Sequence, residues 1–167
     1  MAKRYGYTSR YSLADYMVTI TIPAVGQLVS EQITIGGPGE DGKGSCIGEI
    51  KVTRNTDMWS TEADATGSWV HNKTLDKTGT VELNIRQVSN YVIKLMQVCS
   101  AYESIASTAA GLTISVGPAN SDTGAVVNFI TCEDCFITKI PDQDYADTAA
   151  EQTWVFTCGQ VKFSPTL

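Results

Sequence analysis

The sequence predicts a mainly β protein, a β-barrel or two-sheet sandwich of about eight strands with one packed α-helix. Short stretches in which apolar and polar residues alternate recur along most of the chain, and a period of two is typical of strands with one buried face. A single stretch has the three- and four-residue spacing of an amphipathic helix. Hydrophobic residues make up 43% and charged residues 18% of the sequence, which fits one core with largely covered sheets.

The clearest elements lie side by side in the sequence. Apolar Val81, Leu83 and Ile85 alternate with polar residues and predict a strand from Gly79. The period then changes, and residues 89–105 are predicted to form the helix, with Ser89 as its N-cap. Its apolar stripe includes Val92, Leu95, Cys99 and Tyr102.

The first half of the chain is expected to contain three more strands, an arm and a hairpin. Residues 1–15 are polar and tyrosine-rich and form an N-terminal arm in this interpretation. A polar segment, 55–77, predicts an extended hairpin with its tip at Asp64–Gly67. The expected strands are Tyr16–Ile22, Gln32–Ile35 and Cys46–Arg54, with a glycine-rich acidic loop at Gly36–Gly44.

The last third of the chain predicts four strands. The first three are Leu112–Val116, Val126–Thr131 and Cys135–Ile140, with Glu133–Asp134 between the last two and an acidic loop at Pro141–Gln152. The fourth begins at Trp154. Its apolar residues change parity after Cys158, and Gly159 is where we expect a β-bulge to absorb the extra residue. We therefore treat residues 1–167 as a single domain.

Charge and hydropathy exclude several classes of partner. The formal net charge is −6, whereas proteins that bind nucleic acid through its phosphates need a basic surface. No apolar run approaches the roughly 18 residues of a membrane span, and no apolar segment follows Lys3–Arg4 as in a secretory signal. We expect a protein made in a cytosol, with its five cysteines reduced and packed as small hydrophobic residues.

The sequence offers few residues for chemistry. Cys132-Glu133-Asp134-Cys135 has the spacing of a redox pair or of half a zinc site, but it lies between strands and has no second ligand pair. In an unbroken strand, residues three apart point to opposite faces, so ordinary packing is the favoured interpretation. His71 is the only histidine and lies on the polar hairpin. We therefore predict no catalytic residue, no metal and no cofactor.

The order of these features resembles phage tail tube proteins, which are similar to the inner-tube subunits of contractile bacteriocins and type VI secretion systems. The matching features are the strand Ile47–Arg54, the hairpin with Ala65-Thr66-Gly67-Ser68-Trp69, and Lys77-Thr78-Gly79 opening the next strand. A helix beginning Ser89-Asn90 follows. The closing run CEDCFITKIPDQDYADTAAEQTWVFTCGQVKF is similar too.

This resemblance implies a structural subunit of hexameric rings that stack into a tail tube, whose lumen conducts DNA into the host without binding it specifically. The implied location is the virion tail, after synthesis in the bacterial host cytoplasm. Implied partners are other copies of the chain and the tail sheath, tape measure and terminator or baseplate proteins, with no membrane or small-molecule substrate. The candidate lumen-facing residues are Glu49, Lys51, Thr53, Glu82, Asn84 and Arg86. A bacteriocin or secretion tube, or a β-barrel binding or adhesion module of a virion, is the alternative.

Overall fold

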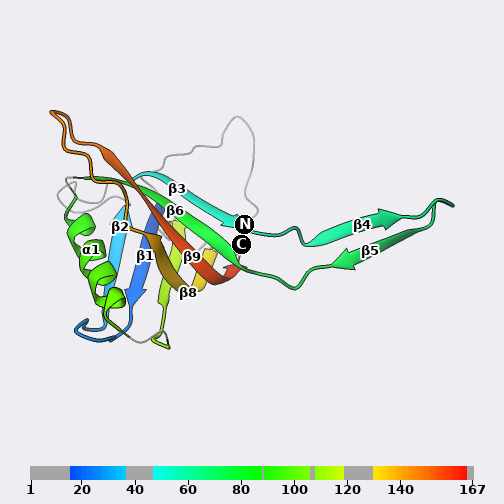
Figure 1. Ribbon diagram of the computed structural model, residues 1–167, viewed down its shortest axis with the longest axis horizontal. Helices are drawn as coiled ribbons and strands as arrows, with labels where there is room; N and C mark the ends of the chain where they lie inside the picture. Colours follow the sequence, from blue (N-terminus) through cyan, green and yellow to red (C-terminus); the bar gives the residue numbers. More distant parts are fainter. Residues whose placement is uncertain (1–15, 37–46, 88, 106–107, 119–129, 165–167) are drawn as a thin grey trace, which may run out of the picture.

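The computed structural model describes residues 16–36, 47–87, 89–105, 108–118 and 130–164 (Figure 1). Within these ranges the chain forms nine strands and one helix. The strands are β1 (Tyr16–Ile22), β2 (Glu31–Gly36), β3 (Ile47–Arg54), β4 (Trp59–Ala63), β5 (Trp69–Lys73), β6 (Gly79–Arg86), β7 (Leu112–Pro118), β8 (Ile130–Lys139) and β9 (Glu151–Phe163), and the helix is α1 (Asn90–Glu103). The predicted mainly β fold with one packed helix is confirmed.

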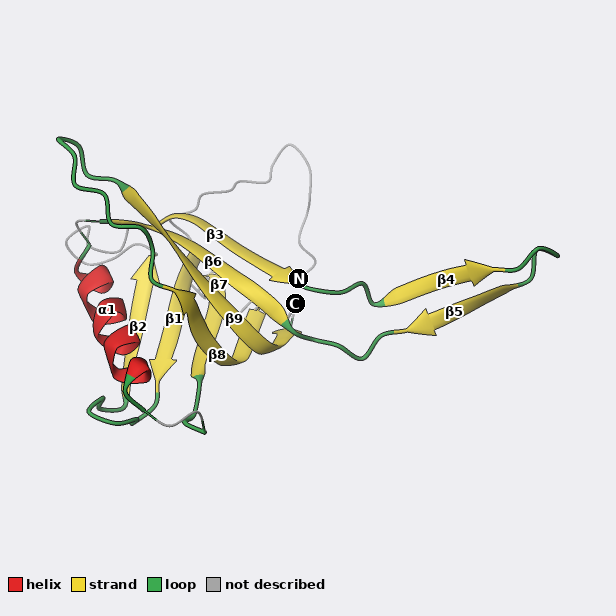
Figure 2. Cartoon of the chain, viewed as in Figure 1, coloured by secondary structure: helices red, strands yellow, loops and turns green. Residues whose placement is uncertain are grey.

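Seven strands form one curled antiparallel sheet in the order β2-β1-β7-β8-β9-β6-β3, and β4 pairs with β5 in a separate hairpin (Figure 2). The hairpin projects from one end of the body, and α1 lies at the other end (Figure 1). In the described part of the chain, β2 pairs only with β1 and β3 pairs only with β6. Among the described residues, the two edge strands of the curled sheet are therefore each paired on one side only.

The inner face of the sheet and one side of α1 form the core. Alternate residues of the central strands are buried, and Trp154 and Phe156 of β9 are the largest fully buried side chains. From the helix, Val92, Leu95, Val98 and Cys99 are buried against this face. Leu95 is 0% exposed, and burial of a leucine contributes about 1.5–3 kcal/mol.

One polar contact caps the helix, and a second ties it to the sheet. The Ser89 side chain accepts a hydrogen bond from the Tyr91 amide at 3.3 Å, so the predicted N-cap is present. Lys94 forms an ion pair with Glu31 at the start of β2. The helix is thereby held near one open edge of the sheet.

Two expected boundaries were wrong. Glu133 and Asp134 do not separate two strands, because β8 runs continuously from Ile130 to Lys139 between β7 and β9. Glu151 and Gln152 belong to β9 and not to the acidic loop. Gln152 is 3% exposed, and its Nε2 donates to Gln143 Oε1 at 3.2 Å. The N-terminal arm 1–15, the turn 119–124 and the glycine-rich loop after Gly36 lie outside the described residues.

Candidate functional site

The six residues proposed to face a lumen lie together on one side of the sheet. On β6, buried Val81, Leu83 and Ile85 alternate with the polar residues, so the polar side chains point away from the core. On β3, Ile50 and Val52 pack against the core. The antiparallel register places the polar side chains of the two strands opposite one another. We call this outward side of β3, β6, β8 and β9 the polar face.

Hydrogen bonds join three strands across the polar face. Asn84 Nδ2 on β6 donates to Glu49 Oε2 on β3 at 3.4 Å. Thr153 Oγ1 on β9 donates to Asn84 Oδ1 at 2.8 Å. Asn84 therefore fixes the relative positions of side chains from both neighbouring strands.

Basic residues on the polar face lie opposite acidic ones. Lys51 is the register partner of Glu82, and Arg86 is the register partner of Glu151. Nearer the other end of β9, Lys162 Nζ lies 3.2 Å from Glu133 Oε1. Opposite charges attract one another at directly paired positions, as for Lys51 and Arg86, and at the diagonal contact of Lys162, so each of these cations has a local counter-charge.

Glu151 and Thr153 are members of the polar face that the sequence interpretation missed. Both alternate with buried residues of β9, as Glu82 and Asn84 do on β6. The alternation of Glu151, Thr153 and Val155 was visible in the sequence, but polar Gln152 stands at the buried position between the first two.

The hairpin lies in segment 55–77, where the sequence predicts one, and its tip has the expected location. Asp64 Oδ1 accepts hydrogen bonds from the amides of Thr66 and Ser68 and from the Thr66 hydroxyl, at 2.6–3.0 Å. Gly67 has φ 87°, which a side chain would disfavour. The Thr66 hydroxyl bond, followed by the backbone bonds, lowers the pKa of Asp64 below its usual value.

Large apolar side chains of the hairpin are exposed. All ten residues of β4 and β5 are exposed, and the exposed fraction is 55% for Trp59 and 67% for Trp69. Lys73 Nζ lies 5.8 Å from the centre of the Trp59 ring. His71 Nδ1 lies 2.8 Å from the Thr61 hydroxyl on the paired strand. An isolated two-stranded hairpin is marginally stable, so burial of these apolar side chains against another molecule would stabilise it.

The structure corrects the expectation that Cys132 and Cys135 point to opposite faces. Both side chains are 0% exposed and lie on the core side of β8. Asp134 between them has φ 55°, and the register with β7 shifts between Leu112 and Ile114, so β8 carries an extra residue at this point. Cys158 of β9 is paired with Cys135, and their Sγ atoms are 2.9 Å apart.

Gly159 marks the expected change of parity in β9. Gly79 is paired with Cys158, so an unbroken register would place Gln160 opposite Lys77. Instead Val161 N donates to Lys77 O at 2.8 Å. β9 therefore has one extra residue here, which is a bulge. A Cβ on Gly159 would lie 3.4 Å from the side chain of Asp134. The irregular positions of β8 and β9 therefore face each other.

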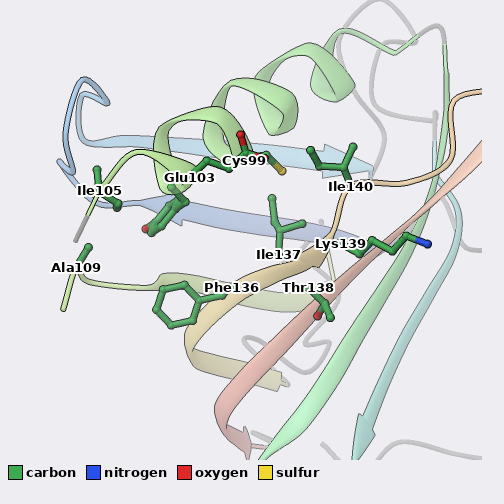
Figure 3. Close-up of a pocket in the computed structure, with 10 residues that line it drawn as sticks. Cys99, Glu103, Ile105, Ala109, Phe136, Ile137, Thr138, Lys139 and Ile140 are labelled. Atoms are coloured by element: carbon green, nitrogen blue, oxygen red, sulfur yellow. The ribbon is translucent and has the colours of Figure 1, made fainter. Parts of the chain in front are cut away.

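A pocket of about 680 Å³ lies between the C-terminal end of α1 and β8 (Figure 3). Its lining is largely apolar and includes Phe136, Ile137 and Ile140, with Cys99 and Glu103 from the helix. Burial, and secondarily the charge of Glu103, raises the pKa of Cys99 to about 11. This thiol is protonated at neutral pH and is therefore a poor nucleophile.

The described ranges hold neither a metal-binding group nor a membrane-spanning helix. No group of three or more His, Cys, Asp and Glu side chains there could hold a metal ion. No helix in these ranges is both long enough and apolar enough to cross a membrane.

Residues 9–164 match the model of a family described as bacteriophage PhiTE tail tube protein. Among solved structures, the fold is similar to a chain of the sheath/tube terminator of an extracellular contractile injection system, PVC, in its extended state, with 12% identity, a TM-score of 0.55 and coverage of 95% of this chain and 99% of that one.

Two further solved structures share the fold. The tube terminating cap of the anti-feeding prophage has 13% identity, a TM-score of 0.54 and coverage of 98% and 97% of the two chains. A chain of the PVC sheath-tube complex in its extended state has 12% identity, a TM-score of 0.54 and coverage of 96% and 95%. Comparison with curated proteins gives no sequence match.

Proposed function

This chain belongs to the bacteriophage PhiTE tail tube protein family, and from that membership we propose that it assembles into six-membered rings that stack as a hollow tube conducting DNA. The family and the shared fold support a structural role in a tail tube. Ring formation, stacking and cargo are the further parts of the proposal.

The observation that carries ring formation is the pair of open edges. An exposed strand edge offers unpaired backbone N–H and C=O groups and invites pairing with another chain. The edge strands β2 and β3 stand at opposite ends of the sheet order. Neighbouring copies that join their sheets edge to edge would pair both edges and close a continuous barrel, with the polar face lining its bore.

Stacking is assigned to the hairpin. It extends beyond the end of the body that lies opposite α1 (Figure 1). Its exposed Trp59 and Trp69 would be covered by a neighbouring ring. Contact between unlike ends of identical subunits is heterologous, and a heterologous contact that does not close on itself generates an open filament.

Free passage of DNA would follow from the charges on the polar face. Phosphate binding requires Lys or Arg side chains that release counterions from the DNA. Here Lys51, Arg86 and Lys162 each lie opposite a carboxylate, and Glu49 adds a further negative charge. A bore lined in this way gives the DNA backbone no strong attachment point.

The remaining proposed partners are the tail sheath, tape measure and terminator or baseplate proteins, in a virion tail whose subunits are made in the bacterial host cytoplasm. We propose no enzymatic role. His71 is hydrogen-bonded to Thr61 on an exposed hairpin, and the Cys99 thiol is protonated at neutral pH. A bacteriocin or secretion tube that carries no DNA has the same assembly requirements.

Negative-stain electron microscopy of the purified protein tests assembly. We expect hollow tubes or stacked rings, and six-fold symmetry in end views. Uniform monomers over a wide range of protein and salt concentrations would contradict the ring proposal and favour the binding-module alternative. Rings with another symmetry would contradict only the proposed number of six subunits and would leave ring formation supported.

A further inference from the structure

Three buried thiols form a cluster that the proposed tube function does not use. Cys132 and Cys135 come from β8 and Cys158 from β9, and their exposed fractions are 0%, 0% and 2%. Cys135 and Cys158 are direct register partners, with their Sγ atoms 2.9 Å apart. Cys158 also interacts with the Cys132 side chain.

The backbone at this point fits a cross-strand disulfide. Directly opposed Cα atoms of an antiparallel pair lie about 4.5–5.5 Å apart, within the roughly 4.4–6.8 Å range of disulfides. Both side chains already point to the same face. A bond between Cys135 and Cys158 therefore requires no movement of β8 relative to β9.

We propose that Cys135 and Cys158 are an oxidation site that forms a reversible disulfide between β8 and β9, with Cys132 as an alternative partner for Cys158. The chemical class of the oxidant is a small peroxide, which can reach a buried cluster more easily than a bulky disulfide can. The inference goes beyond the proposed function, because it depends on the subunit fold alone.

The reaction balances with hydrogen peroxide as the oxidant. The thiolate of one partner attacks a peroxide oxygen, the O–O bond breaks, and a sulfenic acid and hydroxide form. The second thiol then attacks the sulfenic sulfur and displaces its hydroxyl group, which leaves as water after proton transfer. Overall, two thiols and one peroxide give one disulfide and two waters, so the sulfurs are oxidised and the peroxide is reduced.

The surroundings of the cluster make this oxidation slow at neutral pH. The hydrogen bond with Cys132 favours the Cys158 thiolate, but the bond with Cys135 and burial outweigh it and raise the pKa of Cys158 to about 12. The interaction with Cys158, followed by burial, raises the pKa of Cys132 as well. The oxidation rate is therefore expected to increase with pH.

Peptide mapping tests the bond directly. The native protein is treated with hydrogen peroxide, catalase removes the excess, and free thiols are alkylated with iodoacetamide in denaturant. Cleavage after Lys139 separates Cys158 from the other two cysteines, and cleavage after Glu133 separates Cys132 from Cys135. We expect a peptide containing Cys135 linked to one containing Cys158, lost on reduction with dithiothreitol.

Thermal unfolding of the same oxidised sample provides a second readout. Closure of the chain between residues 135 and 158 is expected to raise the melting temperature by roughly 5–10 °C over the reduced protein. A melting temperature that falls on oxidation would overturn the claim that the bond fits the folded backbone.

Single-residue variants identify the partners. Cys132→Ala should retain the link, and Cys135→Ala should move it to Cys132–Cys158. Cys99→Ala is the matched control, a thiol of the same core that should leave the link unchanged. Recovery of both Cys135 and Cys158 in alkylated form after peroxide treatment, or links mainly to Cys46 or Cys99, would overturn the proposal. The wild-type map decides the question even if a variant fails to fold.

Discussion

Gly79 of β6 packs directly against Val161 of β9, with no room for a side chain between them. A Cβ at position 79 would lie 2.5 Å from Val161 Cγ2 and 2.5 Å from the carbonyl oxygen of Thr53 on β3. Beside this contact, an Arg54 Nη atom donates to Val161 O at 2.7 Å, and the guanidinium lies 5.1 Å from the centre of the Phe163 ring. Gly79 thus allows three neighbouring strands to approach where the hairpin leaves the body.

Gly79→Ala is therefore expected to lower the free energy of unfolding by about 1–3 kcal/mol, the usual cost of overpacking. Urea unfolding measures this. Gly48→Ala is the matched control on β3, since the three atoms nearest to its methyl group would all belong to the carboxylate of Glu151, which can swing aside. Equal stability of the two variants would contradict the close packing at Gly79.

The apolar stripe of α1 makes a second prediction. Leu95→Ala removes a fully buried side chain and should cost about 2–5 kcal/mol in urea unfolding. Ile93→Ala, two residues away, alters a side chain that is 62% exposed and should change stability by less than about 0.5 kcal/mol. A large loss in the Ile93 variant with none in the Leu95 variant would reverse the assigned faces of the helix.

The charge pairs of the polar face predict a gain of DNA binding. Combining Glu82→Gln with Glu151→Gln leaves Lys51 and Arg86 opposite neutral side chains. The affinity of this variant for double-stranded DNA should be higher than that of the wild type. It should fall steeply as the salt concentration increases, with a slope of log affinity against log salt of about −0.9 for each phosphate contacted. Fluorescence anisotropy of labelled DNA measures it.

The control for this prediction removes a negative charge outside the polar face. Glu62→Gln alters an exposed acid of the hairpin, outside the polar face, and should leave DNA binding unchanged. Binding that increases equally in both cases would mean that net charge matters and the paired charges do not. Stability should stay within about 0.5 kcal/mol of wild type in each variant.

The hairpin tip is expected to respond to acid. The folded-state pKa of Asp64 lies below 3.8, its usual value, chiefly because of the Thr66 hydroxyl. The stabilisation of the turn is therefore complete above pH 3.8 and is lost as the pH falls through the folded-state pKa. Amide hydrogen exchange at Thr66 and Ser68 should accelerate relative to the intrinsic rate over that interval. Asp64→Asn should abolish this extra pH dependence, and its persistence would exclude Asp64 as the titrating group.

Tube growth should depend on the aromatic residues of the hairpin. Trp69→Ala removes a side chain that is 67% exposed in the subunit, so we expect little effect on folding and a severe loss of tubes by electron microscopy. Trp69→Phe keeps an aromatic ring and should retain assembly. Normal tubes from a protein with both Trp59 and Trp69 replaced by alanine would refute stacking through these side chains.

The sequence was most informative where burial and local periodicity agree. Val81, Leu83 and Ile85 alternate with polar residues through β6, and all three are fully buried. Ser89 caps α1 because a local hydroxyl can satisfy a first-turn amide without tertiary help. Short-range chemistry was enough for these elements.

The sequence misled where tertiary contacts outweigh local preference. Glu133–Asp134 has the composition of a turn, but pairing with β7 and β9 on both sides keeps it inside a strand, with Asp134 at φ 55°. Gln152 is polar and follows an acidic segment, as a loop residue would, yet it is buried and hydrogen-bonded to Gln143. The thiol cluster depends on the first of these features, so spacing alone could not predict it.

The bulges at Asp134 of β8 and Gly159 of β9 lie opposite each other, and this limits where residues can be inserted or deleted in these two strands. The register of β8 with β9 is constant across them, from Cys132–Val161 to Cys135–Cys158. Deletion of Asp134 alone would shift every later residue of β8 by one position, so that Cys135 and Ile137 would turn outward or the pairing with β9 would slip. An indel in one strand is thus tolerable only with a matching indel in the other, and substitution is the easier route for this part of the sheet to diverge.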